Sequence, residues 1–320
     1  MTVSLSHRSR VQRRSRVAAL LRAACYVECV QSPVRSRLQI VAAALLFSTG
    51  GAAVKAATLT GWQIASFRSG IAALVLLAVL PAARRGWNWR MLPVAVAYAA
   101  TLILFVLANR LTTAANAIFL QATAPIYVLL LGPWLLHERV RRSDIFYIAA
   151  VAVGLALFFA GSESAVASAP DPARGNLLAL ASGVTYALML AGLRWQGKHG
   201  EPDAGLKTAV AGNILAFLLA LPAALPVHAF SAADAAVILY LGLFQVGLAY
   251  WCLTRAIRHV SAFEATTMLQ LEPAASPFWT WLAYHESPSF RALTGGILII
   301  SATLVNTWRN RRNGAAGRKS

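Results

Sequence analysis

The chain has 320 residues, of which 58% are hydrophobic and 12% are charged, and its mean hydropathy is +0.60. Soluble globular domains carry about 25% charged residues, so this composition excludes a soluble domain and indicates a membrane protein. The formal net charge of +18 does not indicate nucleic-acid binding, because the basic residues lie in the tails and alternate loops and not along one face.

Residues 1–37 contain eight arginines and a single acidic residue, Glu28. The semi-apolar segment 17–30 is interrupted by Arg22 and Glu28, so it is too short and too charged to span a bilayer. We expect a disordered basic cytoplasmic tail held near anionic lipid head groups.

The rest of the chain contains ten apolar stretches, each close to the ~20 residues that cross a hydrocarbon core. Backbone groups cannot remain unpaired in lipid, so these stretches are predicted to be helices. The sequence therefore predicts an all-α membrane protein with ten transmembrane helices, at residues 38–57, 60–80, 91–109, 113–136, 145–161, 176–193, 208–225, 232–253, 261–284 and 293–308.

The distribution of Lys and Arg predicts the orientation of these helices. With the N-terminus inside, the inner segments contain 24 Lys and Arg residues and the outer loops contain 3, while two more lie within helices. Such a bias favours cytoplasmic N- and C-termini. Residues 309–320 then form a second basic cytoplasmic tail.

The apolar segment from Leu120 to Glu138 returns 148 positions later, where Pro273 matches Pro125 and Glu286 matches Glu138. Five helices in each half make an odd number, so the second half enters the membrane from the opposite side. We therefore predict two inverted five-helix repeats.

The boundaries of these repeats follow from the composition of the chain. The first repeat is predicted at residues 38–161 and the second at residues 175–308. The Ser/Pro/Ala/Gly-rich segment 162–174 reads as an extracytoplasmic linker.

The paired prolines, Pro125 and Pro273, are predicted near the centres of helices four and nine. Each would leave a carbonyl unpaired one turn earlier, on Gln121 and Leu269. A broken backbone at matching positions of two halves is typical of a transporter binding site. The alternative is a kink that serves packing alone.

Ionisable groups inside the membrane cost about 2.5–3.5 kcal/mol or more each. Arg68 and Glu272 are predicted near mid-depth, where they face the interior, sense substrate charge and are candidates for pairing with each other. The alternative is structural pairing without a transport role. Glu264 lies about one turn into helix nine, and Lys55 lies near an outer helix end, where its side chain can snorkel.

Polar and aromatic side chains within the predicted helices are candidates for lining a cavity. For any single one of them, contact between helices is the simpler interpretation. The candidates are Ser48, Thr49, Gln63, Tyr98, Asn116, Gln121, Thr185, Tyr186, Gln245, Tyr250, Trp251, Gln270, Trp279 and Trp281.

No catalytic residue, metal site or cofactor is predicted. The sequence contains no Walker loop and no G-x-S-x-G motif. Its six histidines do not have metal-ligand spacing, and three cysteines cannot form a disulfide framework.

Several strings resemble the EamA-type members of the drug/metabolite transporter superfamily. They are A-N-A-I-F-L-Q-A-T-A-P-I-Y-V, L-E-P-A-A-S-P-F-W-T-W-L-A-Y-H-E, S-T-G-G-A-A-V-K-A and S-F-R-S-G. The resemblance implies an inner-membrane transporter with a central cavity between its halves. It also implies that Pro125, Glu138, Pro273 and Glu286 are family positions with a structural role.

These observations predict a secondary transporter of a small organic solute, an amino acid or related metabolite, moved outward by alternating access. Protons are a candidate coupling ion, with Glu272 as the group that would bind them. The alternatives are a membrane-embedded enzyme, a lipid-head-group carrier and a membrane scaffold that transports nothing.

Overall fold

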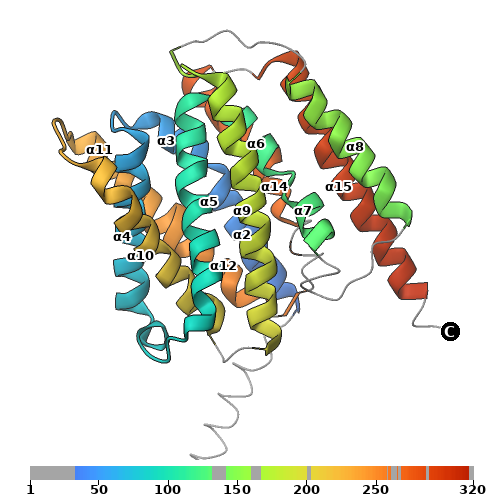
Figure 1. Ribbon diagram of the computed structural model, residues 1–320, viewed down its shortest axis with the longest axis horizontal. Helices are drawn as coiled ribbons and strands as arrows, with labels where there is room; N and C mark the ends of the chain where they lie inside the picture. The colour runs from blue at the N-terminus through green and yellow to red at the C-terminus, as the bar shows by residue number, and fades with distance from the viewer. Residues whose placement is uncertain are drawn as a thin grey trace, which may run out of the picture.

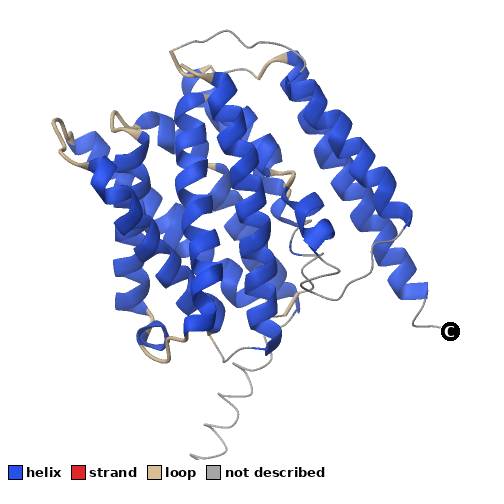
Figure 2. Cartoon of the chain, viewed as in Figure 1, coloured by secondary structure: helices blue, strands red, loops and turns tan. Residues whose placement is uncertain are grey.

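The computed structural model describes residues 33–131, 142–159, 167–199, 203–257, 259–260, 265, 268–285 and 288–316. In this part of the chain the regular elements are all helices, joined by short loops (Figure 2). The predicted all-helical architecture is confirmed.

Within the described residues, the first half of the chain forms seven α-helices and two short 3₁₀ turns. They are α2 (Pro33–Ser48), α3 (Gly50–Ala56), α4 (Gly61–Val79), η1 (Pro81–Arg84), η2 (Trp89–Met91), α5 (Leu92–Leu111), α6 (Ala114–Gln121), α7 (Ala124–Leu131) and α8 (Arg142–Phe159).

The described part of the second half consists of α-helices and a π-helical segment, η4. Its elements are α9 (Pro172–His199), α10 (Ala204–Ala224), α11 (Ala232–Tyr240), η4 (Leu241–Leu248), α12 (Ala249–Ala256), α14 (Leu271–Tyr284) and α15 (Phe290–Ala316).

Seven spans in the described part of the chain are long and apolar enough to cross a bilayer. They are Val34–Ala56, Gly61–Val79, Trp89–Leu111, Ala114–Leu131, Pro172–Gly197, Ala204–Ala224 and Ala232–Ala256. Two shorter apolar helices, Ile145–Leu157 and Phe290–Asn306, accompany them. The chain is therefore a multi-pass membrane protein, whereas the total of ten membrane spans stays a prediction.

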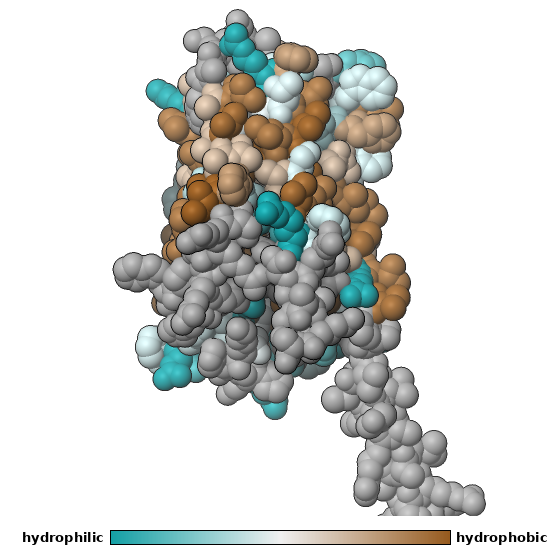
Figure 3. All heavy atoms as spheres, turned by 90° about the vertical axis from the view of Figure 1, so that its right-hand side faces the viewer, coloured by the Kyte–Doolittle hydropathy of each residue, from teal (hydrophilic) through white to brown (hydrophobic). Residues whose placement is uncertain are grey.

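The outer face of the α8–α15 pair shows how the surface suits lipid. Hydrophobic side chains cover much of its visible part, and hydrophilic ones gather toward its ends (Figure 3). Water-soluble proteins rarely expose large contiguous apolar patches, so this face contacts acyl chains. The large apolar side chains of α8 and α15 that are more than half exposed are Ile145, Phe146, Val153, Phe290, Ile297, Val305 and Trp308.

Capping side chains fix the starts of two spans at one end of the bundle. Thr60 Oγ1 accepts a hydrogen bond from the Gln63 backbone N–H, and Gln63 Oε1 accepts from the Thr60 N–H at the start of α4. Ser231 and Asp234 form the same capping box at the start of α11. Asp234 also accepts from the backbone N–H and hydroxyl of Thr58. Its carboxylate therefore joins the loop before α4 to the start of α11.

The helices break before the paired prolines. Pro125 is the second residue of α7, after α6 ends at Gln121, and Pro273 is the third residue of α14. In a first helical turn the missing proline N–H has no intrahelical acceptor to lose. The sequence placed each proline near the middle of one predicted span, whereas in the structure each lies in the first turn of a new helix that follows a break.

Three helices of the structure extend beyond the spans that the sequence predicts. α2 starts at Pro33, inside the predicted tail, and α9 starts at Pro172, inside the predicted linker. Proline is favoured at the first helical position, which explains both starts. α15 continues to Ala316, into the predicted C-terminal tail, because Arg and Ala propagate a helix well.

The helices of the two halves pack in a reciprocal pattern (Figure 1). α4 packs along α10, and α8 packs along α15, which pairs equivalent helices. α5 contacts α9 as α12 contacts α2, and α6 contacts α9 as α14 contacts α2. The packing thus stays the same when the halves are exchanged, as expected for two copies of one unit.

Close helix packing at Gly212 gives a first testable prediction. A Cβ at this position of α10 would lie 2.4 Å from Tyr98 Cδ1 on α5. Gly212→Ala is expected to lower stability by about 1–3 kcal/mol through overpacking, measured by thermal unfolding in detergent. Gly197→Ala is the control, because no atom lies within 4 Å of its Cβ position. Equal melting temperatures for the two variants would contradict this packing.

Candidate functional site

Arg68, on α4, is a charged side chain buried inside the bundle, with 1% of its surface exposed. Its Nη2 donates to the Leu102 carbonyl on α5 at 3.0 Å, and its Nη1 donates to Gln245 Oε1 on η4 at 3.2 Å. Among the described residues its buried Nε has no hydrogen-bond partner. Both acceptors are neutral, so the positive charge is oriented without being compensated.

Arg68 lines a cavity of about 30 Å³ between the two halves of the chain. The lining combines one cation, one carboxylate, two amides and several aromatic rings. Its residues are Phe47, Arg68, Thr101, Leu102, Phe105 and Gln121 from the first half, and Tyr186, Gln245, Tyr250 and Glu272 from the second.

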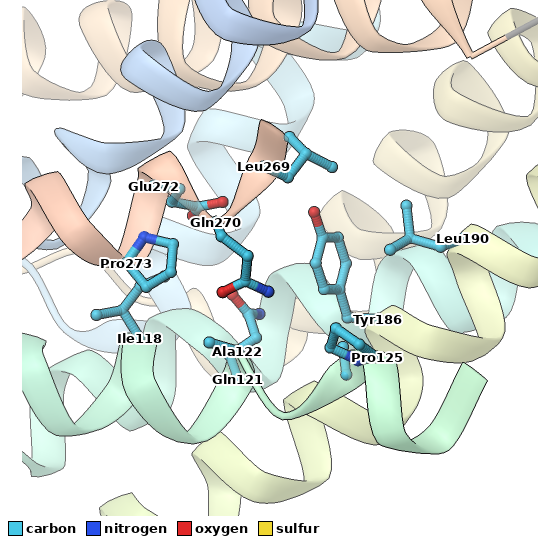
Figure 4. A pocket seen from close by; sticks show the side chains of 11 residues that line it. Ile118, Gln121, Ala122, Pro125, Tyr186, Leu190, Leu269, Gln270, Glu272 and Pro273 are labelled. Atoms are coloured by element: carbon cyan, nitrogen blue, oxygen red, sulfur yellow. The ribbon is translucent and has the colours of Figure 1, made fainter. Parts of the chain in front are cut away.

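A second cavity of about 30 Å³ adjoins the first and shares Gln121, Tyr186 and Glu272 with it. Figure 4 shows the amides of Gln121 and Gln270 between the Glu272 carboxyl group and the Tyr186 ring. The other lining residues are Ile118, Ala122, Ala124, Pro125, Leu190, Leu269 and Pro273.

Each cavity has room for only a few water molecules. A cavity needs about 10–15 Å³ to hold one water, so a volume of about 30 Å³ holds roughly two. A larger solute requires the surrounding helices to move apart. The breaks at α6–α7 and at the start of α14 border this space, since Pro125 and Pro273 both line it.

Glu272, at the second position of α14, is 7% exposed. No hydrogen bond or ion pair to it is found within the described ranges, and the predicted pairing with Arg68 does not form there. A buried carboxylate without a partner is costly. The cavity wall therefore carries a guanidinium and a carboxyl group that do not pair with each other among the side chains that the structure describes.

The two remaining amides of the site differ in how they are held. Gln121 Nε2 donates to Ser182 Oγ on α9 at 2.7 Å, so its side chain is fixed to the second half. The buried Gln270 Oε1 has no partner in the part of the chain described here. Gln270 is thus an acceptor that a bound solute can use.

Two other predicted site residues, Tyr250 and Tyr98, lie at the first cavity or next to it. Tyr250 lines it, with its ring 4.6 Å from that of Tyr98 and 4.8 Å from that of Phe47. Tyr98 itself supports Tyr250 from behind and accepts a hydrogen bond from Asn213 Nδ2 at 3.0 Å. Tyr98 is therefore a packing residue next to the site.

Three predicted site residues lie away from the cavity. Trp251 packs against residues of α4 and α10, with the Arg255 guanidinium 5.1 Å from the centre of its ring. Asn116 Nδ2 donates to Thr112 Oγ1 near the start of α6. Lys55 donates to the carbonyls of Thr112 and Ser168 at a helix end, so it joins connecting segments.

Several neutral polar candidates form contacts between helices. Trp279 Nε1 donates to Ser48 Oγ at 3.0 Å, and the hydroxyls of Thr49 and Tyr240 lie 2.8 Å apart. Gln63 Nε2 donates to the Ala224 carbonyl at 3.1 Å. These side chains fasten helices together, which was the simpler interpretation.

Glu138, Glu264 and Glu286 lie outside the described residues. The predicted mid-membrane residues Arg68, Glu272, Gln121, Gln245 and Gln270 are brought together by the fold. The apolar part of the lining could not be selected from the sequence, because its residues resemble every other apolar residue of the spans. Those residues are Phe47, Leu102, Phe105, Ile118, Leu190 and Leu269.

Comparison with known proteins gives the family. A model described as the EamA-like transporter family matches residues 36–160 and, again, residues 173–308. No curated protein matches the chain. A solved structure, described as "Crystal structure of protein", has a TM-score of 0.63 and 18% identity, over 88% of this chain and 99% of that chain; at this identity the likeness concerns the fold alone. On its two matches to one family model, the chain belongs to the EamA-like transporter family, within the drug/metabolite transporter superfamily.

Proposed function

We propose that this protein is a secondary transporter that exports a zwitterionic solute, an amino acid or close derivative, across the cell inner membrane. Family membership implies secondary transport. The observation that supports the finer proposal is the central cavity with Arg68 and Glu272 both on its wall. A carboxylate bound at Arg68 and an ammonium group bound at Glu272 would compensate both buried charges.

The proposed architecture is ten spans in two inverted repeats, with both termini in the cytoplasm. Three observations support it: the bias of Lys and Arg toward alternate loops, the two family matches, and the reciprocal packing of equivalent helices. Inverted repeats allow one half to rock against the other around a fixed central site.

Outward movement then requires one end of the bundle to open. At the end that carries the starts of α4 and α11, Asp234 binds Thr58 and Lys55 binds Thr112 and Ser168. In the proposed orientation this end is extracytoplasmic, so these contacts hold the outer gate closed. Their release would expose the cavity to the outside.

The energy source in this proposal is a gradient. The Glu272 carboxylate needs a positive partner both when the site moves outward with solute and when it returns empty. During the outward step the ammonium group of the solute supplies it. A proton would neutralise the carboxylate on the way back. Because Glu272 binds either the solute or a proton, export of the solute is coupled to entry of a proton.

The test is counterflow of labelled amino acids into liposomes that contain the purified protein. We expect saturable exchange of at least one amino acid that protein-free liposomes do not show. Chemical conversion of the label without flux would favour a membrane-embedded enzyme. Flux of a labelled phospholipid head group with no amino-acid exchange would favour a lipid-head-group carrier, and complete inactivity would favour a scaffold.

A further inference from the structure

The π-helical segment η4 is an irregular feature of the bundle that borders the cavity. π-helical turns are rare and are enriched at functional sites. η4 joins α11 to α12 and packs against α4, the helix that carries Arg68. Gln245, in this segment, is 4% exposed and contacts Arg68.

Two glycines allow the segment to take this course. A Cβ at Gly247 would lie 2.9 Å from the Gly242 carbonyl oxygen, five residues earlier, which is the carbonyl that a π-turn directs there. A Cβ at Gly242 would lie 2.9 Å from the Arg68 carbonyl oxygen. A side chain at Gly242 would push η4 away from α4, and a side chain at Gly247 would crowd the backbone of η4 itself.

A third glycine, Gly50 on α3, makes room for the side chain of Gln245 itself. A Cβ at Gly50 would lie 2.6 Å from Gln245 Nε2. The backbone of α3 therefore contacts one side of the Gln245 amide. On the other side, the amide oxygen accepts the hydrogen bond from Arg68. The amide has little freedom to turn away.

We propose that Gln245 is a positioning residue, which holds the Arg68 guanidinium so that its Nε edge receives the carboxylate of a ligand. The Leu102 carbonyl and the Gln245 amide occupy Nη2 and Nη1, and the buried Nε has no partner within the described ranges. Because both anchors are neutral, they orient the guanidinium and leave its charge for the ligand. A carboxylate in place of the amide would neutralise it.

This inference deepens the proposed function, because it names how that site recognises an anionic group. It also stands apart from transport, since carboxylate binding can be measured on the purified protein alone. The probe is glycine, with acetate as a ligand that has the carboxylate only. The measurement is the rise in melting temperature with ligand concentration, from which a dissociation constant is obtained.

Gln245→Glu is the main variant, because it keeps the shape of the side chain and adds a charge next to Arg68. We expect unfolding of the ligand-free variant at or above the wild-type temperature, together with carboxylate affinity at least about tenfold weaker, as for loss of one charged hydrogen bond. Gly50→Ala is expected to weaken binding in the same direction by displacing the amide. Gly205→Ala is its control, since the nearest atom to that Cβ lies at 3.7 Å.

The results separate the two proposals. Wild-type affinity retained within twofold in Gln245→Glu would overturn the positioning role, as would a wild-type protein that neither glycine nor acetate stabilises. Carboxylate binding that depends on Gln245 in a protein without counterflow would support the inference and contradict the proposed function.

Discussion

Replacing Arg68 with alanine is expected to reduce the counterflow efficiency for the transported zwitterion by at least about a hundredfold. The variant loses the group that would bind the substrate carboxylate, and hydrogen bonds to charged groups contribute about 1.5–3 kcal/mol each. It also leaves the Leu102 carbonyl and the Gln245 amide without their donor. The measurement is the initial rate of exchange over a range of substrate concentrations.

Two further variants identify the cause of this loss. Arg68→Lys keeps the charge but cannot hold two anchors and a ligand as the planar guanidinium does, so we expect intermediate activity. Arg84→Ala is the matched control, because Arg84 also donates to two carbonyls, of Leu77 and Ala78, but on the exposed end of the bundle. If Arg68→Ala and Arg84→Ala exchanged substrate equally well, the site would lie elsewhere.

Replacing Glu272 with glutamine is the second large expected effect. Glutamine has the same shape and no charge, so the variant should lose affinity for the substrate ammonium group by about tenfold or more. Accumulation against a gradient should also be lost, because the variant cannot exchange a proton for the solute. Stability should be kept or increased, since the change removes a buried carboxylate that lacks a partner.

The matched control for Glu272 is Asp171→Asn. Asp171 is a surface acid whose Oδ2 lies 3.2 Å from Arg174 Nε, and exposed pairs contribute little to stability. We expect wild-type uptake and melting temperature for this variant. Uptake by Glu272→Gln that matches the wild type, both with and without a proton gradient, would refute the role of Glu272 in binding and coupling.

Much of the architecture could be predicted from the sequence, because lipid imposes strong constraints on a spanning chain. Each long apolar run must be a helix, and the structure contains helices in these regions. Pro125 and Pro273 were correctly selected as related positions near the site, and they do line one cavity. Their position in the first turn of a new helix could not be predicted, since a proline both disrupts the helix that precedes it and suits the start of the next one.

The charged part of the site could be predicted for a similar reason. Charge inside a membrane is costly, so Arg68 and Glu272 stood out against apolar surroundings. The direction in which each aromatic side chain points was not predicted from the sequence. Trp251 and Tyr98 therefore looked equivalent to Tyr250 in the sequence, although Tyr250 alone of these three lines the cavity.

The π-helical course of η4 could not be predicted at all. Its sequence, L-G-L-F-Q-V-G-L, fits a regular helix equally well. Gly242 packs against α4 and Gly50 packs against Gln245, and neither contact can be recognised in the sequence. Gln245 was therefore predicted to contact the substrate, whereas in the structure its side chain contacts Arg68.

The most direct measurement is competition against counterflow of the labelled substrate in the wild-type protein, using three ligands with the same side chain. These are the amino acid, its amide, which keeps only the ammonium group, and its N-acetyl derivative, which keeps only the carboxylate. We predict that the amino acid competes at least about tenfold better than either derivative, because each lacks one charged contact. Equal competition by all three would contradict recognition of a zwitterion between Arg68 and Glu272.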